Sequence, residues 1–570
     1  MPLRSALAVA LLLAAGAPAV AAPPSPRDEA LRLAPPDFAL VVVVQNLRDH
    51  VKAVAESPFA AWLPTTTFGK FVLNSEAFKQ FTDGATPVLG ALGLTPTDLL
   101  HDIIGDAAVF AFTPGPPNDP KGERSVVLIR PRKPDALAKV IATLNDAQTK
   151  NGELKAVVEH AHAGGAYSER RKPSGPSDFY CFSGGVFAFS QSEADIKAAI
   201  DRGRGAKDAP PVLVDRMTKL GVADAAAVVL VHPRALDGEL AAKLKGAKAD
   251  ERAFLAKFAE VWAATDAAAL YLAVGRDAEL GVSMSFTPDK LPATVKPWLV
   301  GERAPSALWA SVPDDALLAV AGRVKATDLL DVLGTLAPTD GKTGIRETLE
   351  QTLGPIVGKD KLPLVLDALG PDWALWATPP APNEVVPAVV AAVKVQGTGT
   401  KGAEASKSLI QTLEYGFQVA RIAYNAKHKD QIGLKEEKDG DAVIKTLSGD
   451  GLPPGLRPCF ALKGGYLLVS TSPDAIKAFK PPTTDPKPGG DVPLARFNAT
   501  AARAYLTAHA ASLAKLAAGV GAGDEKTLAE QLGVRAAALE PADKAELFAR
   551  GDATGLKLTL RIKPAKPLKK

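Results

Sequence analysis

Apolar residues follow a two-residue period in many short stretches of this chain, and clusters of turn residues separate the stretches. ALVVVVQ at 39–45 is a β-branched run suited to a buried strand. AAVFAF and SVVLIR follow it, divided by the turn-rich segment PGPPNDPKGE. At 133–145 and 193–202 the apolar residues recur at helical spacing instead. The pattern therefore predicts an α+β fold with antiparallel strands joined by hairpins.

Two distant segments repeat nearly the same pattern, CFSGGVFAFSQSEADIKA at 181–198 and CFALKGGYLLVSTSPDAIKA at 459–478. Three more pairs occur in the same order: PPDFAL with VPDDAL, GDAAVFAFTP with GPDWALWATP, and YLAVGRDAELGVSMSFTP with LFARGDATGLKLTLRIKP. Repeats of this length outrank any local assignment. We expect an internal duplication into two homologous lobes, each with antiparallel sheets and helices packed on one face.

Proline- and glycine-rich seams divide the lobes further, and a long helix is expected within 401–439 of the second lobe. The expected divisions are a signal peptide at 1–21, a linker at 22–34, a first lobe at 35–300 (parts 35–205 and 212–300), a second lobe at 304–564 (parts 304–485 and 490–564), and a basic tail at 565–570.

The N-terminus has the pattern of a secretory signal peptide. Arg4 precedes an apolar run at 6–15, and Ala19-Val20-Ala21 forms an A-x-A site, so we expect cleavage after Ala21 and export to the periplasm or the exterior. The run is too short to cross about 30 Å of hydrocarbon. No later stretch predicts an integral membrane segment in the mature chain. With 67 basic and 63 acidic residues, the chain lacks the basic excess expected of a nucleic-acid-binding protein.

Cys181 and Cys459 are the two cysteines, and each precedes a Phe where a strand enters a glycine hairpin. One interpretation is a disulfide that ties the lobes together, which export would permit. The other is that both are small buried residues at one duplicated core position. A bridge needs the two strands to face each other closely, so both interpretations stay open.

No other residues predict a catalytic, cofactor or metal site. His160 and His162 would share one face of a strand, but a closed zinc site needs four ligands. The S-x-x-K match at Ser512 and the K-T-G match at Lys342 occur in the reverse of the order used by penicillin-binding proteins. Trp309, Trp373 and Trp376 could line a groove, although the alignment of the strand bracketed by Trp373 and Trp376 with AVFAF favours core packing.

Several of these stretches together resemble a known family. They are PPDFALVVVV, the Leu-rich LLHDIIGDAAVFAF, VVLIR, a helix that begins at Lys133-Pro134-Asp135, and the glycine hairpin followed by S-x-S-x-x-D-I-K-A. This combination resembles the bacterial exported proteins grouped as domain of unknown function family 3352. The resemblance implies an exported α+β protein and assigns no functional residues.

We therefore expect an exported, non-catalytic binding or scaffold protein, not an enzyme, with an unknown protein or envelope ligand as partner and no cofactor. One alternative is a periplasmic carrier of an apolar ligand, which predicts a continuous apolar pocket of several hundred Å³. A second alternative is an envelope hydrolase with a site in one lobe only. That enzyme would bring ionisable groups with perturbed pKa values together in a cleft.

Overall fold

In the computed structural model, the described residues are 25–46, 103–116, 122–205, 210–336, 362–396, 399–519 and 521–565, with a few further positions between 48 and 101 and between 351 and 358. The expected signal peptide lies outside them, as do residues 566–570 of the expected tail. Lys342 of the K-T-G match lies outside them as well.

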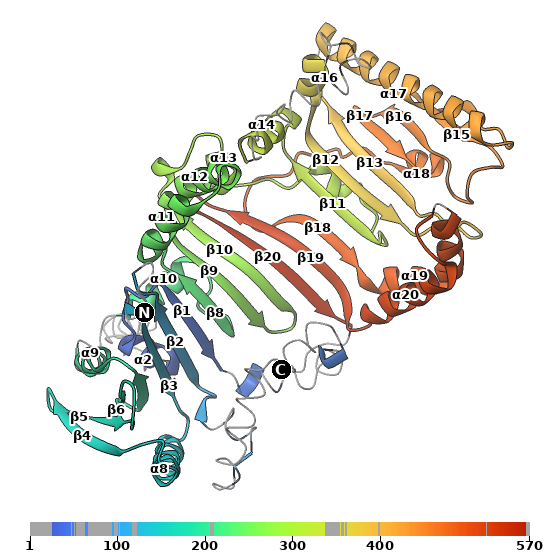
Figure 1. Ribbon diagram of the computed structural model, residues 1–570. Helices are drawn as coiled ribbons and strands as arrows, with labels where there is room; N and C mark the ends of the chain where they lie inside the picture. Colours follow the sequence, from blue (N-terminus) through green and yellow to red (C-terminus); the bar gives the residue numbers. More distant parts are fainter. Residues whose placement is uncertain are drawn as a thin grey trace, which may run out of the picture.

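Twenty strands form one antiparallel sheet (Figure 1). Those of the first half are β1 Leu40–Gln45, β2 Ala107–Thr113, β3 Arg124–Arg130, β4 Ala156–His162, β5 Gly165–Arg171, β6 Asp178–Ser183, β7 Val186–Ser190, β8 Ala227–Val231, β9 Thr265–Val274 and β10 Ala278–Phe286. Those of the second half are β11 Leu318–Arg323, β12 Leu369–Thr378, β13 Ala388–Val395, β14 Gly433–Asp439, β15 Ala442–Ser448, β16 Cys459–Lys463, β17 Tyr466–Ser470, β18 Val492–Asn498, β19 Ala542–Gly551 and β20 Gly555–Pro564.

The helices lie at the ends and on the faces of this sheet. They include α2 Pro26–Leu33, α8 Pro134–Lys150, α9 Glu193–Arg204, α10 Val212–Lys219, α11 Asp237–Gly246, α12 Ala249–Ala264, α14 Ala326–Leu336, α16 Leu362–Ala368, α17 Gly399–Lys427, α18 Pro473–Ala478, α19 Ala499–Gly519 and α20 Glu525–Ala538. The strands and hairpins expected from the two-residue period are confirmed, and so is the long helix of the second half, α17.

The pairings place the strands in the order β4-β5-β6-β7-β3-β2-β1-β8-β9-β10 and then β20-β19-β18-β11-β12-β13-β17-β16-β15-β14. Read from its own outer edge, each half has the same order. The two halves meet where β10 pairs with β20, from Ala278 opposite Ile562 to Ser285 opposite Gly555. Both halves have the expected antiparallel strands, and these strands form one continuous ladder across the two halves.

Both glycine hairpins have the same backbone conformation. Gly184 and Gly185 have φ values of 59° and 81°, and Gly464 and Gly465 have 58° and 80°. Two successive residues with positive φ match the right-handed twist of the flanking strands, and glycine takes this conformation without steric cost. Pairs of adjacent glycines therefore fix the β6–β7 and β16–β17 hairpins.

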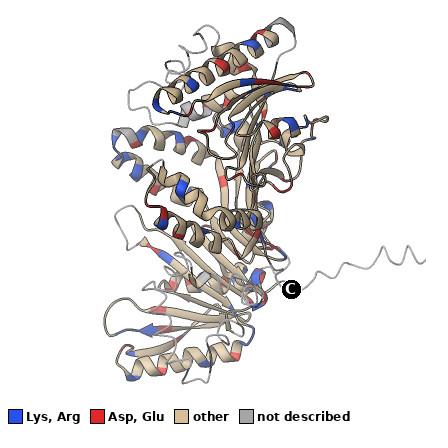
Figure 2. Ribbon diagram, turned by 90° about the vertical axis from the view of Figure 1, so that its right-hand side faces the viewer, with Lys and Arg blue, Asp and Glu red and all other residues tan. Residues whose placement is uncertain are grey.

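Helices lie on both faces of β3 and β7 and of β13 and β17, so the expectation of helices on one face is wrong. We call the face that carries α8 and α17 the front face, and the face that carries α2, α9, α10 and α18 the back face. Figure 2 shows the sheet nearly edge-on, and the long helices lie on one side of it. On the front face, α8 packs on β3 and β7 through Leu137 and Phe187, and α17 packs on β13 and β17 through Leu409 and Leu467.

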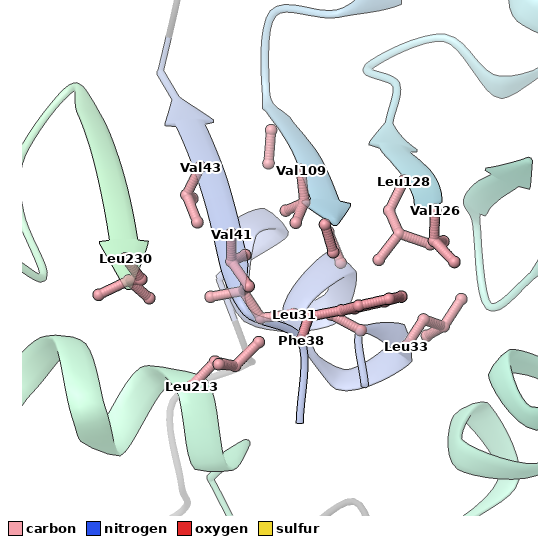
Figure 3. Close-up of a cluster of buried hydrophobic side chains, with 14 of the residues drawn as sticks. Leu31, Leu33, Phe38, Val41, Val43, Val109, Val126, Leu128, Leu213 and Leu230 are labelled. Atoms are coloured by element: carbon pink, nitrogen blue, oxygen red, sulfur yellow. The ribbon is translucent and has the colours of Figure 1, made fainter. Parts of the chain in front are cut away.

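The back face of the first half holds the largest group of buried side chains (Figure 3). Alternate residues of β1, such as Val41 and Val43, point into this group, as period-two burial requires. Leu31 and Leu33 of α2 close it from below, so residues 26–33 form a core helix and not the expected linker. Ser25 begins α2 by accepting a hydrogen bond from the Asp28 N–H at 3.2 Å.

Gly281 of β10 provides a test of the junction between the halves. A Cβ at this position would lie 2.5 Å from the Tyr271 ring and 2.5 Å from the Leu558 carbonyl oxygen. We expect Gly281→Ala to lower the free energy of unfolding by about 2 kcal/mol, since overpacking displaces the Tyr271 side chain. Urea unfolding measures this change. Gly433→Ala, in edge strand β14 with open space around it, is the matched control and should shift the midpoint little. Equal effects of the two variants would contradict the packing.

Candidate binding surface

The central strands carry a wide front surface that has no charged side chain. Residues directly opposite each other on neighbouring strands share a face, so the pairings define rows across the sheet. The middle row crosses ten strands: Ala108, Val44, Ala227, Leu272, Leu280, Leu560, Leu547, Ala495, Val320 and Leu375. The flanking rows are Phe110, Val42, Val229, Leu270, Val282 and Leu558, and Val274, Ala278, Ile562, Ala545, Phe497, Leu318 and Ala377. We call these three rows the apolar front surface.

Many large side chains of the apolar front surface are open to solvent. Leu270 and Leu280 are 47% and 46% exposed, and Leu318 and Leu375 are each 42% exposed. Single exposed apolar residues are ordinary, whereas contiguous apolar patches beyond a few hundred Å² mark binding sites. The middle row is about 43 Å wide, because neighbouring strands lie about 4.8 Å apart. With three rows about 7 Å apart, the surface covers about 600 Å².

The back face of the same strands has the opposite character. Glu279, Arg561, Glu546 and Arg496 stand opposite one another on β10, β20, β19 and β18, so the charges alternate in sign across four strands. Arg561 donates from Nε to Glu279 Oε1 at 2.8 Å, and this hydrogen bond raises the pKa of the guanidinium. These four strands therefore carry charged residues behind and apolar residues in front.

Helices border the apolar front surface. The end of α12 packs on the front of β10 and β20, where Val261 and Ala264 contact Met284 and Leu556. With α8 and α17 over the outer strands, the described helices leave the front of the central strands between them uncovered (Figure 1). An apolar pocket of about 480 Å³ lies between α11 and α12, next to Phe258 and Trp262.

A pocket of about 290 Å³ continues the apolar front surface at its β11–β12 end. It is lined by Val324, Ala326, Leu329, Leu369, Gly370, Trp373 and Val393. Trp373 lies on the front face, two residues before Leu375 and opposite Gly322 and Val393. The indole lies so close over Gly322 that a Cβ there would be 2.7 Å from Cζ2. Glycine at position 322 therefore lets Trp373 lie flat against the sheet beside the pocket.

The three tryptophans noted in the sequence have different surroundings. Trp376 is 4% exposed in the back core of the second half and stacks on Phe479 with ring centroids 6.3 Å apart. Trp309 donates from Nε1 to the Pro493 carbonyl at 2.8 Å. Core packing thus holds for Trp376, whereas Trp373 lines the 290 Å³ pocket.

The structure has both cysteines as free thiols in different hydrophobic cores, so the bridge between Cys181 and Cys459 is not formed here. They also do not share one duplicated position. Across the hairpins Cys181 pairs with Ala188 and Cys459 with Ser470. Counted from the two glycine turns, Cys181 corresponds to Ala461, because the second hairpin has two more residues before its turn. The matching Cys-Phe pairs in the sequence therefore suggested an equivalence of Cys181 and Cys459 that is wrong by two residues.

His160 and His162 do not meet at one site. His160 Nε2 lies 3.0 Å from Glu169 Oε2, and His162 Nε2 lies 3.0 Å from Asp201 Oδ1. Hydrogen bonds from Arg171 and His160 lower the pKa of Glu169 to about 2. Among the described residues, no group of three or more His, Cys, Asp and Glu side chains is placed to hold a metal ion.

Comparison with known proteins adds no relative. No protein-family model, no curated protein and no solved structure matches the chain. Within the part of the chain that the structure describes, no helix has both the length and the apolar character needed to cross a membrane.

Burial predicts how the thiols react. Removal from water raises the pKa of Cys181 to about 11 and that of Cys459 to about 12, so at pH 8 both remain protonated and poorly nucleophilic. We expect iodoacetamide to leave the folded protein unlabelled and to alkylate both cysteines in denaturant without reductant. Mass spectrometry of the intact chain measures both results. Labelling in denaturant that requires a reductant would show a bridge and contradict the structure.

Proposed function

We propose that the chain is an exported, non-catalytic binding protein whose partner lies on the apolar front surface. The observation that carries this proposal is the set of three uncharged rows, because a soluble chain of this charge density seldom leaves so wide a surface without a polar residue. The backbone groups beneath are paired in the sheet. Recognition there rests on apolar contact and shape rather than on hydrogen bonds.

The size of the surface fits a binding role. About 600 Å² of apolar surface removed from water stabilises a complex by about 15 kcal/mol at about 25 cal/mol per Å². Association and ordering oppose this with a cost of about 4–15 kcal/mol. At a cost of about 7 kcal/mol the surplus is about 8 kcal/mol, which corresponds to a micromolar dissociation constant without any ionic contact.

We further propose that the two halves descend from an internal duplication. The equal strand order from each edge supports this, and so do the matching glycine turns. A smaller detail agrees: the Ser192 N–H donates to Ser190 Oγ at 3.0 Å, and the Ser472 N–H donates to Ser470 Oγ at 3.0 Å. Under this proposal each copy contributes half of the apolar front surface, and the site exists because the copies share one sheet.

A pair of matched valines tests the proposed function. Val282 lies in the centre of the apolar front surface and is 40% exposed, whereas Val157 is 39% exposed on edge strand β4. We expect Val282→Glu to weaken binding of the neutral dye Nile red at least tenfold, because a buried carboxylate without a partner is strongly disfavoured. Fluorescence titration measures the affinity.

Val157→Glu is the control and should bind the dye as the unchanged protein does. Circular dichroism of both variants shows whether the fold is intact. If folded Val282→Glu binds the dye with unchanged affinity, the apolar front surface is not the binding site.

A further inference from the structure

Resting on the proposed function, we propose that the partner is a single lipid molecule whose acyl chains lie across the strands, with a chain end in the pocket beside Trp373. The apolar front surface offers no charged group and no free backbone group along its middle row. An occupant in contact with it over this width loses any hydrogen bonds that its own polar groups made with water. Hydrocarbon makes no hydrogen bonds with water, so a hydrocarbon occupant loses none on binding.

The dimensions also fit acyl chains. Two leaflets make a hydrocarbon layer of about 30 Å, so one acyl chain is about 15 Å long. The middle row, about 43 Å wide, accommodates two or more such chains end to end. The pocket of about 290 Å³ is close to the lower limit of about 300 Å³ for ligand pockets, which suits the end of one chain.

A second copy of this chain fits less well. Two sheets that pack face to face approach to about 10 Å. The front face carries α8 at one end and α17 at the other, and α12 packs beside β10 and β20. A helix with its side chains is about 10 Å thick, so the helices of two copies would meet before the two apolar surfaces did. Helices that border the surface leave room for a thin occupant.

Chain length is the property that separates a lipid from other apolar partners. We would displace Nile red from the full mature protein with straight-chain alcohols of about 8, 12 and 16 carbons. Each buried methylene should tighten binding about three- to fourfold, from about 0.8 kcal/mol per group. The Val282→Glu variant should lose this dependence and Val157→Glu should keep it. Leu558→Glu, at a position 37% exposed on β20, repeats the test should Val282→Glu fail to fold.

Trp373 gives a position-specific measurement. A brominated fatty acid should quench tryptophan fluorescence, and Trp373→Phe should remove most of the quenching. Trp376→Phe is the control, because Trp376 is buried in the back core and should contribute none of it. Quenching that persists in Trp373→Phe would overturn the placement of a chain end in this pocket.

The outcomes separate the two proposals. Dye binding that is lost in Val282→Glu but shows no dependence on chain length overturns the lipid inference and leaves the proposed function intact. The same holds if sedimentation shows a dimer that Val282→Glu dissociates. Unchanged dye binding in folded Val282→Glu and Leu558→Glu overturns both. With phosphatidylcholine vesicles, the lipid inference requires labelled lipid to move into the soluble protein; protein that stays on the vesicles contradicts it.

Discussion

The pairing of β10 with β20 is the constraint on which the character of the whole surface depends. Side chains alternate between faces along a strand, so a slip of one residue at this pairing would move Lys557 and Arg561 to the front. The back face holds the register. Tyr271 and Thr559 share a buried hydroxyl hydrogen bond of 2.7 Å, and Arg561 is bonded to Glu279. Polar contacts behind the sheet thus keep its front free of charge.

The apolar front surface and the two largest buried clusters lie on opposite faces of the sheet. The large clusters cover the backs of β1, β2, β8 and β9 and of β11 and β12, and smaller clusters cover the fronts of β3 and β7 and of β13 and β17. Four strands at the junction of the halves, β10, β20, β19 and β18, carry charged residues on the back and apolar residues on the front. Because the outer clusters stabilise the fold, the central front residues are free to remain exposed. The resulting surface is rigid, since every strand within it is paired on both sides.

The sequence predicted local structure well and long-range arrangement poorly. Period-two patterns and adjacent glycines identified the strands and the two glycine hairpins, because these depend on neighbouring residues. β20, which pairs with β10, lies almost 280 residues further along the chain, and no residue pattern in either strand predicts this pairing. The sequence predicts a linker at 22–34, yet residues 26–33 form α2, in which Leu31 and Leu33 are buried. The cysteine offset became visible only in the cross-strand pairs.

The apolar front surface had a weak signal in the sequence. ALYLAVG of β9 is apolar on both of its faces, which usually indicates a strand buried on both sides, whereas LGVSMSF of β10 is apolar on one face only. In the structure that interpretation holds for the back of β9, where Tyr271 is buried, and fails for the front, where Leu270 and Leu272 are exposed. β9 thus has the apolar composition of a strand buried on both faces, but among the described residues no other element buries Leu270 and Leu272 on its front face. The apolar residues in excess of what folding uses are therefore the feature of the sequence on which the proposed binding function rests.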